Sequence, residues 1–454
     1  MMKRAILLSM LVLLLCGCGP QNSGSDAAVH PSKSSAVDAS ATEVSVSYPE
    51  APDTQGLTIA RTEHNRYITE AIETFNTLSP DTPLESIWYT DSENELKLAL
   101  IAGDAPDLIS LDGFDYEIYA DKGVFCNLYD WLDADPDFRG DALLSPILRA
   151  MEWSDHTLYQ LSPSFYLQSM YVSPQVWDPD QPFTLPNIAR WMDDHPDAAF
   201  TVNADTPGDL LSLLLDGCMS DYVNYTERTC DFGADFVQLL EDVNGWAQRS
   251  DDTLLESENA FQSGSLLCGW NQLKSFDGYH GLMDQGLTVS VGFPGADHTT
   301  VFAGSVMRYA ICSGTGREDL AWQFLKTTLS AEYQETVPWL PLLRSEWDRR
   351  AQEAMEETPA SVTEAYRNPA DAALGGNTAT VTVTTAPVRG LTQAEIDGLN
   401  DLVEQVSSFG GNTNVELRTI IFDEVDGYFS GQKSAEAVAD VIQNRAGIYL
   451  SEQQ

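Results

Sequence analysis

Apolar positions follow two alternating periods between residues 57 and 111, as in a chain that alternates strands with helices. Ile68, Ile72 and Phe75 recur at helical spacing after a short apolar run. The elements expected here are a strand at 57–60, a helix stopped by Pro80 and Pro83, a strand at 84–89, a helix ending at Gly103, and a buried strand at 106–111. Strands that alternate with helices pair in parallel through right-handed crossovers, so the pattern predicts an α/β fold.

Later segments continue the mixture of helices and strands. Residues 141–262 are expected to be mostly helical, with aromatic loops. Strands are predicted at 289–295, 307–311 and 380–385. Capping-box spacings at Thr315–Glu318 and Thr392–Glu395 each predict the start of a helix, and a last helix is predicted over 434–450.

The first residues have the layout of a secretory signal. Lys3 and Arg4 precede an apolar run that ends at Leu15, too short for the roughly 20 residues that cross a bilayer. The following Cys16-Gly17-Cys18 resembles, with Leu15, the lipobox of bacterial lipoproteins. The resemblance implies cleavage after Gly17, a lipid on Cys18 and attachment to the outer face of a membrane. The alternative is an ordinary signal peptide (residues 1–17) with a chance cysteine.

Composition indicates a folded chain with a flexible tether. Residues 18–56 are rich in Ser, Ala, Thr, Pro and Asp, which is typical of a flexible linker. The 454 residues of the whole chain are 43% hydrophobic, enough to bury sizeable cores. No later segment is apolar and long enough to predict a membrane span.

The net charge of the chain argues against two classes of partner. The chain has 69 acidic and 24 basic residues, a formal net charge of −45, which argues against nucleic-acid binding and against adsorption to anionic lipid. A solvated surface and attraction of cationic ligands are both consistent with this charge. The acidic residues are scattered, without a long run, and this favours the solvated surface.

The remaining cysteines have no ligand spacing. Cys126, Cys218, Cys230, Cys268 and Cys312 form no CxxC pair, so we expect mostly buried thiols and no metal site. A disulfide between Cys218 and Cys230 is left open as an alternative.

Several segments, in order, resemble the sugar-binding type of extracellular solute-binding lipoproteins of ABC importers (family 1). They are Leu98 to Ile109 with its A-G-D-x-P-D core, Ala260 to Leu267, Arg317 to Gln334, and the closing region from Glu424 to Gln453. The resemblance covers residues 57–453. It departs from the family pattern at Tyr171-Val172-Ser173-Pro174 and at residues 183–186, which weakens any transfer of roles to the central loops.

The resemblance implies a fold and a domain plan. The fold is α/β, of the two-lobed periplasmic-binding-protein kind (type II), with a hinge, a ligand cleft and extra C-terminal helices. The expected organisation is residues 57–160 for the first part of lobe 1, 161–300 mainly for lobe 2, and 301–454 for the return to lobe 1 and the C-terminal helices.

No motif of an enzyme is present: we find no HExxH, GxSxG or P-loop pattern, and expect no cofactor and no catalytic residue. Sugar sites need aromatic faces and polar groups that fix hydroxyls. The strand ends and turns offer such candidates, which are the polar residues Glu63, Asn65, Asp112 and Asn271 and the aromatic residues Phe165, Tyr166 and Trp270, with Trp88 and Trp339 as further platforms.

These observations predict a lipid-anchored receptor on the extracytoplasmic face of the cell membrane. It would bind a solute, which the resemblance implies is a carbohydrate, and deliver it to ABC permease subunits as a monomer. Two alternatives are a surface glycoside hydrolase, since paired carboxylates are the chemistry of such enzymes, and a surface interaction lipoprotein without transport.

Overall fold

The computed structural model describes residues 56–452, apart from 90–92, 113, 115, 121, 140, 202–203, 205, 226, 250–259, 359–360, 367–379, 386–387 and 411–413. The chain divides into two units, Met1–Pro52 and Asp53–Gln454, and the described residues all belong to the second. The predicted signal peptide, the lipid site Cys18 and all of the predicted tether except Gly56 lie outside the described residues.

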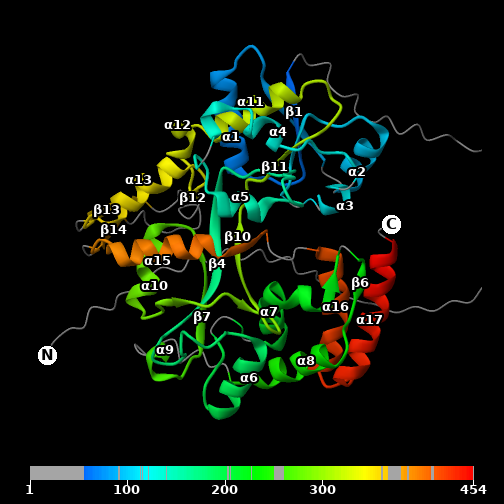
Figure 1. The fold of residues 1–454 in the computed structure, drawn as a ribbon, viewed down its shortest axis with the longest axis vertical. Helices are drawn as coiled ribbons and strands as arrows, with labels where there is room; N and C mark the ends of the chain where they lie inside the picture. The colour runs from blue at the N-terminus through cyan, green and yellow to red at the C-terminus, as the bar shows by residue number, and fades with distance from the viewer. Residues whose placement is uncertain are drawn as a thin grey trace, which may run out of the picture. The chain divides into compact units, whose positions relative to one another are not determined.

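The first sheet has four strands in the order β11-β3-β1-β2 among the described residues. Its strands are β1 (Leu57–Arg61), β2 (Leu84–Trp88), β3 (Leu108–Ser110) and β11 (Tyr309–Ile311), and its crossover helices are α1 (Arg66–Leu78) and α2 (Glu93–Ala102). The first three strands are parallel and β11 runs antiparallel to β3. The predicted alternation of strands and helices in this part is confirmed (Figure 1).

The second sheet is built on β4 (Ser164–Val172), the longest strand that the structure describes. Its other strands are β7 (Cys268–Leu273), β8 (Val289–Ser290), β9 (Phe293–Pro294), β10 (Thr299–Gly304), β12 (Leu340–Pro341) and β15 (Val406–Phe409). Strands β7, β8, β10 and β12 pair with β4 in antiparallel fashion, while β15 runs parallel to β10. The region predicted as mostly helical therefore contains the central strand of this sheet.

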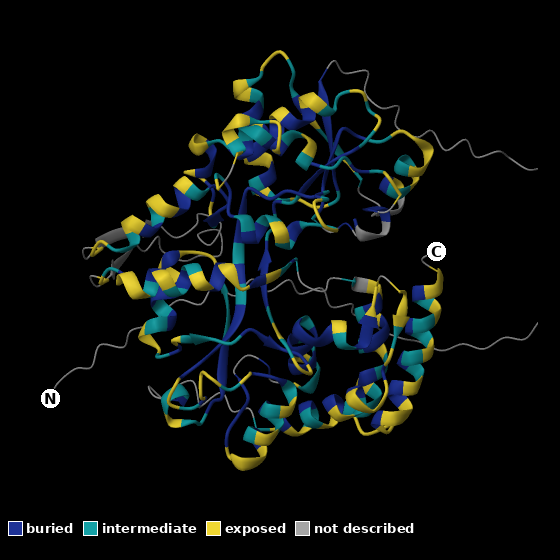
Figure 2. Ribbon diagram, viewed as in Figure 1, coloured by how far each residue is buried: buried dark blue, intermediate teal, exposed yellow. Residues whose placement is uncertain are grey.

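Strands β4 and β10 lie between two cores, and each face of these strands contributes buried residues to a different core. Leu167 and Tyr171 pack in one core, whereas Met170 and Val172 pack in the other. On β10, Ala303 contributes to the first core. This follows from the two-residue period of a strand, which sends neighbouring side chains to opposite faces. Figure 2 shows buried residues along these strands and exposed residues on the outer faces of the helices.

The second core is helical and includes the C-terminal segments. Helices α7 (Pro207–Tyr222), α8 (Ala234–Ala247), α16 (Val415–Phe429) and α17 (Ala435–Glu452) pack against one another there. The predicted last helix is confirmed, and it begins at Ala435 and ends at Glu452. The predicted lobe boundaries remain a prediction, but residues 273–287 contribute to the first core although they lie in the segment assigned mainly to lobe 2.

The other described elements are shorter. The helices are α3 (Glu117–Ala120), α4 (Tyr129–Leu132), a 3₁₀ turn (Pro136–Phe138), α5 (Ser145–Met151), α6 (Leu185–Asp194), α9 (Ala260–Ser263), α10 (Phe276–Asp284), α11 (Glu318–Thr328), α12 (Ala331–Gln334), α13 (Arg344–Ala354) and α15 (Gln393–Glu404). Two hairpin pairs are β5 (Val223–Asn224) with β6 (Thr229–Cys230), and β13 (Ser361–Tyr366) with β14 (Thr380–Thr385). No helix in the described ranges has both the length and the apolar character needed to cross a membrane.

One of the two predicted capping boxes is present. Thr392 and Glu395 bond each other's backbone N–H groups at the start of α15, as predicted. The predicted box at Thr315–Glu318 is wrong, because α11 begins at Glu318 itself with Arg317 as its N-cap. The Glu318 carboxylate instead accepts a hydrogen bond from the Gly314 N–H at 2.8 Å.

The alternative of a disulfide between Cys218 and Cys230 is excluded, because both are free thiols. Cys218 is fully buried on α7, where burial raises the pKa of its thiol far above the usual range. Cys230 is partly buried, and its Sγ lies 3.8 Å from the Gln443 carbonyl oxygen of α17.

Candidate functional site

Asn65 and Asp112 meet at the ends of two neighbouring parallel strands. Asn65 follows β1 and caps α1, where its Oδ1 accepts a hydrogen bond from the Tyr67 N–H at 3.0 Å. Its Nδ2 donates to Asp112 Oδ2 at 2.5 Å and to the Val306 carbonyl oxygen at 2.6 Å. The carboxyl ends of parallel strands share one edge of a sheet, which is where such sheets place ligand-binding groups.

A buried arginine holds the loop that carries Asn65. Arg61, the last residue of β1, is 2% exposed. Its Nη1 donates to Thr69 Oγ1 at 3.0 Å and its Nη2 to the Asn65 carbonyl oxygen at 2.7 Å. Its guanidinium carbon lies 4.4 Å from the centre of the Trp88 ring, and the His64 ring lies 4.3 Å from that same ring. Arg61 was not among the residues predicted for the site; a charged residue at the end of an apolar strand was the available signal.

Burial dominates the electrostatics of Asp112. It raises the pKa of this carboxyl group to about 6, although Asn65, Arg308 and Arg61 all favour the charged form. Charge repulsion from Glu63 also contributes to this raised pKa. Arg308 also donates from Nη2 to the Leu111 carbonyl oxygen at 3.1 Å. The site therefore contains a carboxyl group that gains or loses a proton in mildly acidic conditions.

Three aromatic residues form a second group, which we call the aromatic triad: Tyr67, Tyr166 and Trp339. The Trp339 ring lies 5.8 Å from the Tyr67 ring and 5.6 Å from the Tyr166 ring, edge to face in both cases. All three are partly exposed. The Lys274 ammonium lies 5.9 Å from the Tyr166 ring centre and 5.7 Å from that of Trp339.

A glycine leaves room for the Tyr166 ring. Gly304 of β10 pairs with Tyr166 of β4, and a Cβ atom at position 304 would lie 2.6 Å from the Tyr166 phenol oxygen. The ring therefore lies against the backbone of the neighbouring strand, where a larger residue would displace it.

The triad and the polar pair are neighbours. Tyr67 joins them directly, since its backbone binds Asn65 and its ring contacts Trp339. Burial raises the pKa of the Tyr166 phenol, and the charges of Arg308 and Asp112 also act on it. Together these side chains offer apolar ring faces beside hydrogen-bonding groups, which is the combination that sugar surfaces need.

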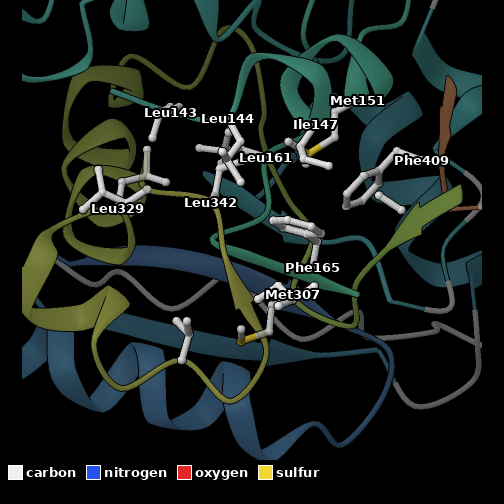
Figure 3. Packing of buried hydrophobic residues seen from close by; sticks show 14 of the residues in the cluster. Leu143, Leu144, Ile147, Met151, Leu161, Phe165, Met307, Leu329, Leu342 and Phe409 are labelled. Atoms are coloured by element: carbon white, nitrogen blue, oxygen red, sulfur yellow. The ribbon is translucent and has the colours of Figure 1, made fainter. Parts of the chain in front are cut away.

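Phe165 does not belong to this site. It is 0% exposed, and its ring stacks on Trp347 at 6.0 Å within the first core. Figure 3 shows it surrounded by other core residues, among them Leu161 and Met307. The prediction that Phe165 contacts a ligand conflicts with this placement, because the β4 residues alternate between faces and only Tyr166 of the two reaches the partly exposed one.

The other predicted residues are more dispersed. Glu63 is exposed on the loop before α1. Trp270 and Asn271 lie on β7, opposite Met170 and Ser169. Met170 is four residues from Tyr166 on β4, or about 14 Å along the strand. Trp270 also packs against the second core, so the structure does not bring it to the triad, and a ligand role for both β7 residues remains a prediction.

The described residues contain no group of three or more His, Cys, Asp or Glu side chains that could hold a metal ion. The site residues offer hydrogen bonds, charge and ring faces, which are the groups that hold a small polar ligand.

Comparisons with known proteins show the family and the fold of the chain. The profile of a family described as bacterial extracellular solute-binding protein matches residues 71–339. The sugar-binding protein MalE from Xanthomonas citri has a TM-score of 0.51 and 13% identity, with 87% of this chain and 98% of that one covered, which shows a shared fold.

Two further solved structures are less similar. An ABC substrate-binding protein from Listeria monocytogenes in complex with cycloalternan has a TM-score of 0.48 at 12% identity, over 88% of this chain and 100% of that one. A family 1 extracellular solute-binding protein from Bifidobacterium longum subsp. infantis has a TM-score of 0.48 at 14% identity, over 86% of this chain and 98% of that one. No curated protein matches the sequence.

Proposed function

The chain belongs to the bacterial extracellular solute-binding protein family, and from this premise we propose that it captures an oligosaccharide outside the cell and delivers it to an ABC permease. The observation that carries the carbohydrate assignment is the partly exposed aromatic triad beside the Asn65–Asp112 pair. Ring faces pack on the C–H surfaces of sugars, while carboxylate and amide groups bind their hydroxyls. MalE, which shares the fold, is named as a sugar-binding protein, and this supports the assignment.

Each part of the site has a proposed role. Trp339 and Tyr166 stack on sugar rings, and Asn65 and Asp112 bind hydroxyl groups. Arg61 is a positioning residue, because it bonds the Asn65 carbonyl oxygen from a buried position without facing the ligand. Glu63, Trp270 and Asn271 remain proposed contacts for a longer ligand.

Calorimetric titration against a panel of oligosaccharides tests the proposal. We expect at least one sugar to bind and Trp339→Ala to weaken that binding by about tenfold or more, the usual effect of truncating a central aromatic residue. Trp191→Ala is the matched control, since Trp191 is also partly exposed but lies on α6, where its ring stacks on His195. Absence of binding to every sugar, or equal binding by the Trp339 variant and the control, would contradict the proposal.

We propose binding without turnover. A glycoside hydrolase would release a chromogenic leaving group, and replacing one carboxylate with its amide would abolish the release. We expect no release above the level of the Asp112→Asn variant. A surface interaction protein without transport predicts no closing cleft, so small-angle scattering with and without the bound sugar separates it from a receptor.

Attachment at Cys18 completes the proposed function. A lipid there would hold the folded residues near the permease through the tether of residues 18–56. Such tethering raises the effective concentration of receptor at the permease without any new contact. We propose that the receptor acts as a monomer.

A further inference from the structure

Positive side chains surround the aromatic triad. The Arg66 guanidinium carbon lies 4.6 Å from the Tyr67 ring centre, and its Nη2 donates to the Tyr67 phenol oxygen at 3.0 Å. Lys274 lies over both other rings, at 5.9 and 5.7 Å. Arg308 is close enough to Tyr166 to lower the pKa of its phenol, which burial raises. Each ring of the triad therefore has a cation beside it.

This cluster of positive side chains contrasts with the acidic composition of the chain. Acidic residues outnumber basic ones by 69 to 24, and the net charge of −45 repels anions at long range. The acidic side chains at the site are Glu63, which is exposed, and Asp112, which already accepts a hydrogen bond from Asn65. Asp216 also acts on Tyr166, but Arg418 pairs with its carboxylate at 2.9 Å.

Among the residues that the structure describes, the three cations form no ion pair that would hold them away from a ligand, although Arg308 also acts electrostatically on the Asp112 carboxyl group and donates from Nη2 to the Leu111 carbonyl oxygen. Within the described residues, none of Arg66, Lys274 and Arg308 forms an ion pair. Glu70 acts electrostatically on Arg66 from one helical turn away. By contrast, Arg317 and Lys326 are tied to carboxylates at 2.8 and 2.6 Å. A cation without a carboxylate partner is free to form charge-assisted hydrogen bonds with an anionic group.

We propose that the solute is an acidic oligosaccharide, with carboxylate or sulfate groups bound by Lys274, Arg66 and Arg308 while its rings stack on the triad. This inference rests on the proposed function and adds the charge of the substrate. The local cations offset the repulsion between an acidic sugar and the rest of the chain. They would give a neutral sugar no comparable advantage.

Pairs of sugars that differ only in their acidic groups test whether the solute is negatively charged. Calorimetry compares uronate oligosaccharides with their methyl esters, and sulfated oligosaccharides with their desulfated forms, at low and high salt. We expect the acidic member of one pair to bind about tenfold more tightly, and this preference to shrink as salt is added. Lys274→Gln should reduce the ratio of the two affinities severalfold. Lys274 is exposed and forms no hydrogen bond within the described residues, so the variant keeps its fold.

Lys122→Gln is the matched control. Lys122 is also exposed and lies 5.4 Å from an aromatic ring, that of Tyr119, but it is not part of the site. Equal or tighter binding of the neutral member of every pair would overturn the inference and leave the proposed function intact. So would an unchanged affinity ratio in the Lys274 variant. Failure of acidic and neutral sugars alike would overturn the proposed function itself.

Discussion

At the residue scale, the protonation of Asp112 makes the stability of the folded chain depend on pH. Burial raises the pKa of this carboxyl group in the folded chain to about 6, above its ordinary value of 3.8. The folded state therefore holds the proton more tightly than the unfolded state. The stability that the protonated group contributes is complete below the ordinary pKa of 3.8 and is lost as the pH rises toward and through about 6.

Asp112→Asn should remove this dependence while keeping an acceptor oxygen for Asn65. We expect the variant to be more stable than the wild type at neutral pH, with the difference disappearing as the pH falls below the ordinary pKa of an aspartic acid. Thermal unfolding of both chains across this range measures the difference. A constant difference, or one that grows toward acid pH, would show that burial does not govern this carboxyl group.

A substitution at Gly304 tests the role of the aromatic triad in sugar binding without altering any of the three side chains. In Gly304→Ala the new Cβ would meet the Tyr166 ring at 2.6 Å, so the ring has to move. We expect sugar affinity to fall about tenfold, as for loss of a central contact, while the melting temperature shifts by only a few degrees.

Gly245→Ala is the control for that substitution. Position 245 lies in α8 with open space around the added carbon, and alanine there should raise stability by up to about 1 kcal/mol without changing affinity. Unchanged sugar binding in the Gly304 variant would remove Tyr166 from the site.

At the element scale, the sequence segments that resemble the family act mainly as structural links. Asp107, in the A-G-D-x-P-D segment, is fully buried at the start of β3. Its carboxylate accepts hydrogen bonds from the N–H and hydroxyl of Thr58 on β1, at 2.8 and 2.9 Å, and from Arg317 Nε at 2.9 Å. Gln334 has a similar role: its side chain is fully buried and bonds the carbonyl oxygens of Pro163 and Thr328.

Asp107→Ala should therefore destabilise the first sheet without touching the site. It leaves a buried hydroxyl, an N–H group and a guanidinium without their acceptor, at a cost of about 3 kcal/mol in the free energy of unfolding. Asp104→Ala, in the same segment but exposed, should change it by less than about 0.5 kcal/mol. Urea unfolding measures both. Equal effects of the two substitutions would contradict the structural role of Asp107.

Local periodicity decides how much of the fold and of the candidate site could be predicted from sequence. The strands and helices from Leu57 to Ser110 follow from spacing alone, and the meeting of Asn65 with Asp112 follows from parallel strand ends. Phe165 and Tyr166 could not be separated, because both are aromatic and β4 packs against a core on each face, so its sequence has no regular alternation of apolar and polar residues. The cations of the site come from distant segments that only tertiary structure brings together.

At the scale of the whole molecule, two cores share strands β4 and β10. Phe302 of β10 packs in the second core and its neighbour Ala303 in the first. The chain returns to the first core at residues 273–287, 301–351 and 391–409, so neither core is continuous in sequence. Folding of either core therefore requires contacts between distant parts of the chain, and we expect the two to unfold cooperatively.

The proposed function makes the place of the folded residues in the cell depend on one side chain outside them, that of Cys18. We expect Cys18→Ala to abolish lipid attachment and release the protein from the membrane fraction, whereas Cys16→Ala, which removes the neighbouring thiol, leaves attachment unchanged. One acyl chain binds a membrane only marginally, so stable anchoring through Cys18 requires at least two chains, and mass spectrometry of the purified lipoprotein should show that added mass. Sugar affinity of the released variant should equal that of the wild type, because the proposed site lies wholly within residues 61–339. Retention of the Cys18 variant in the membrane would mean that the chain is held there by another signal.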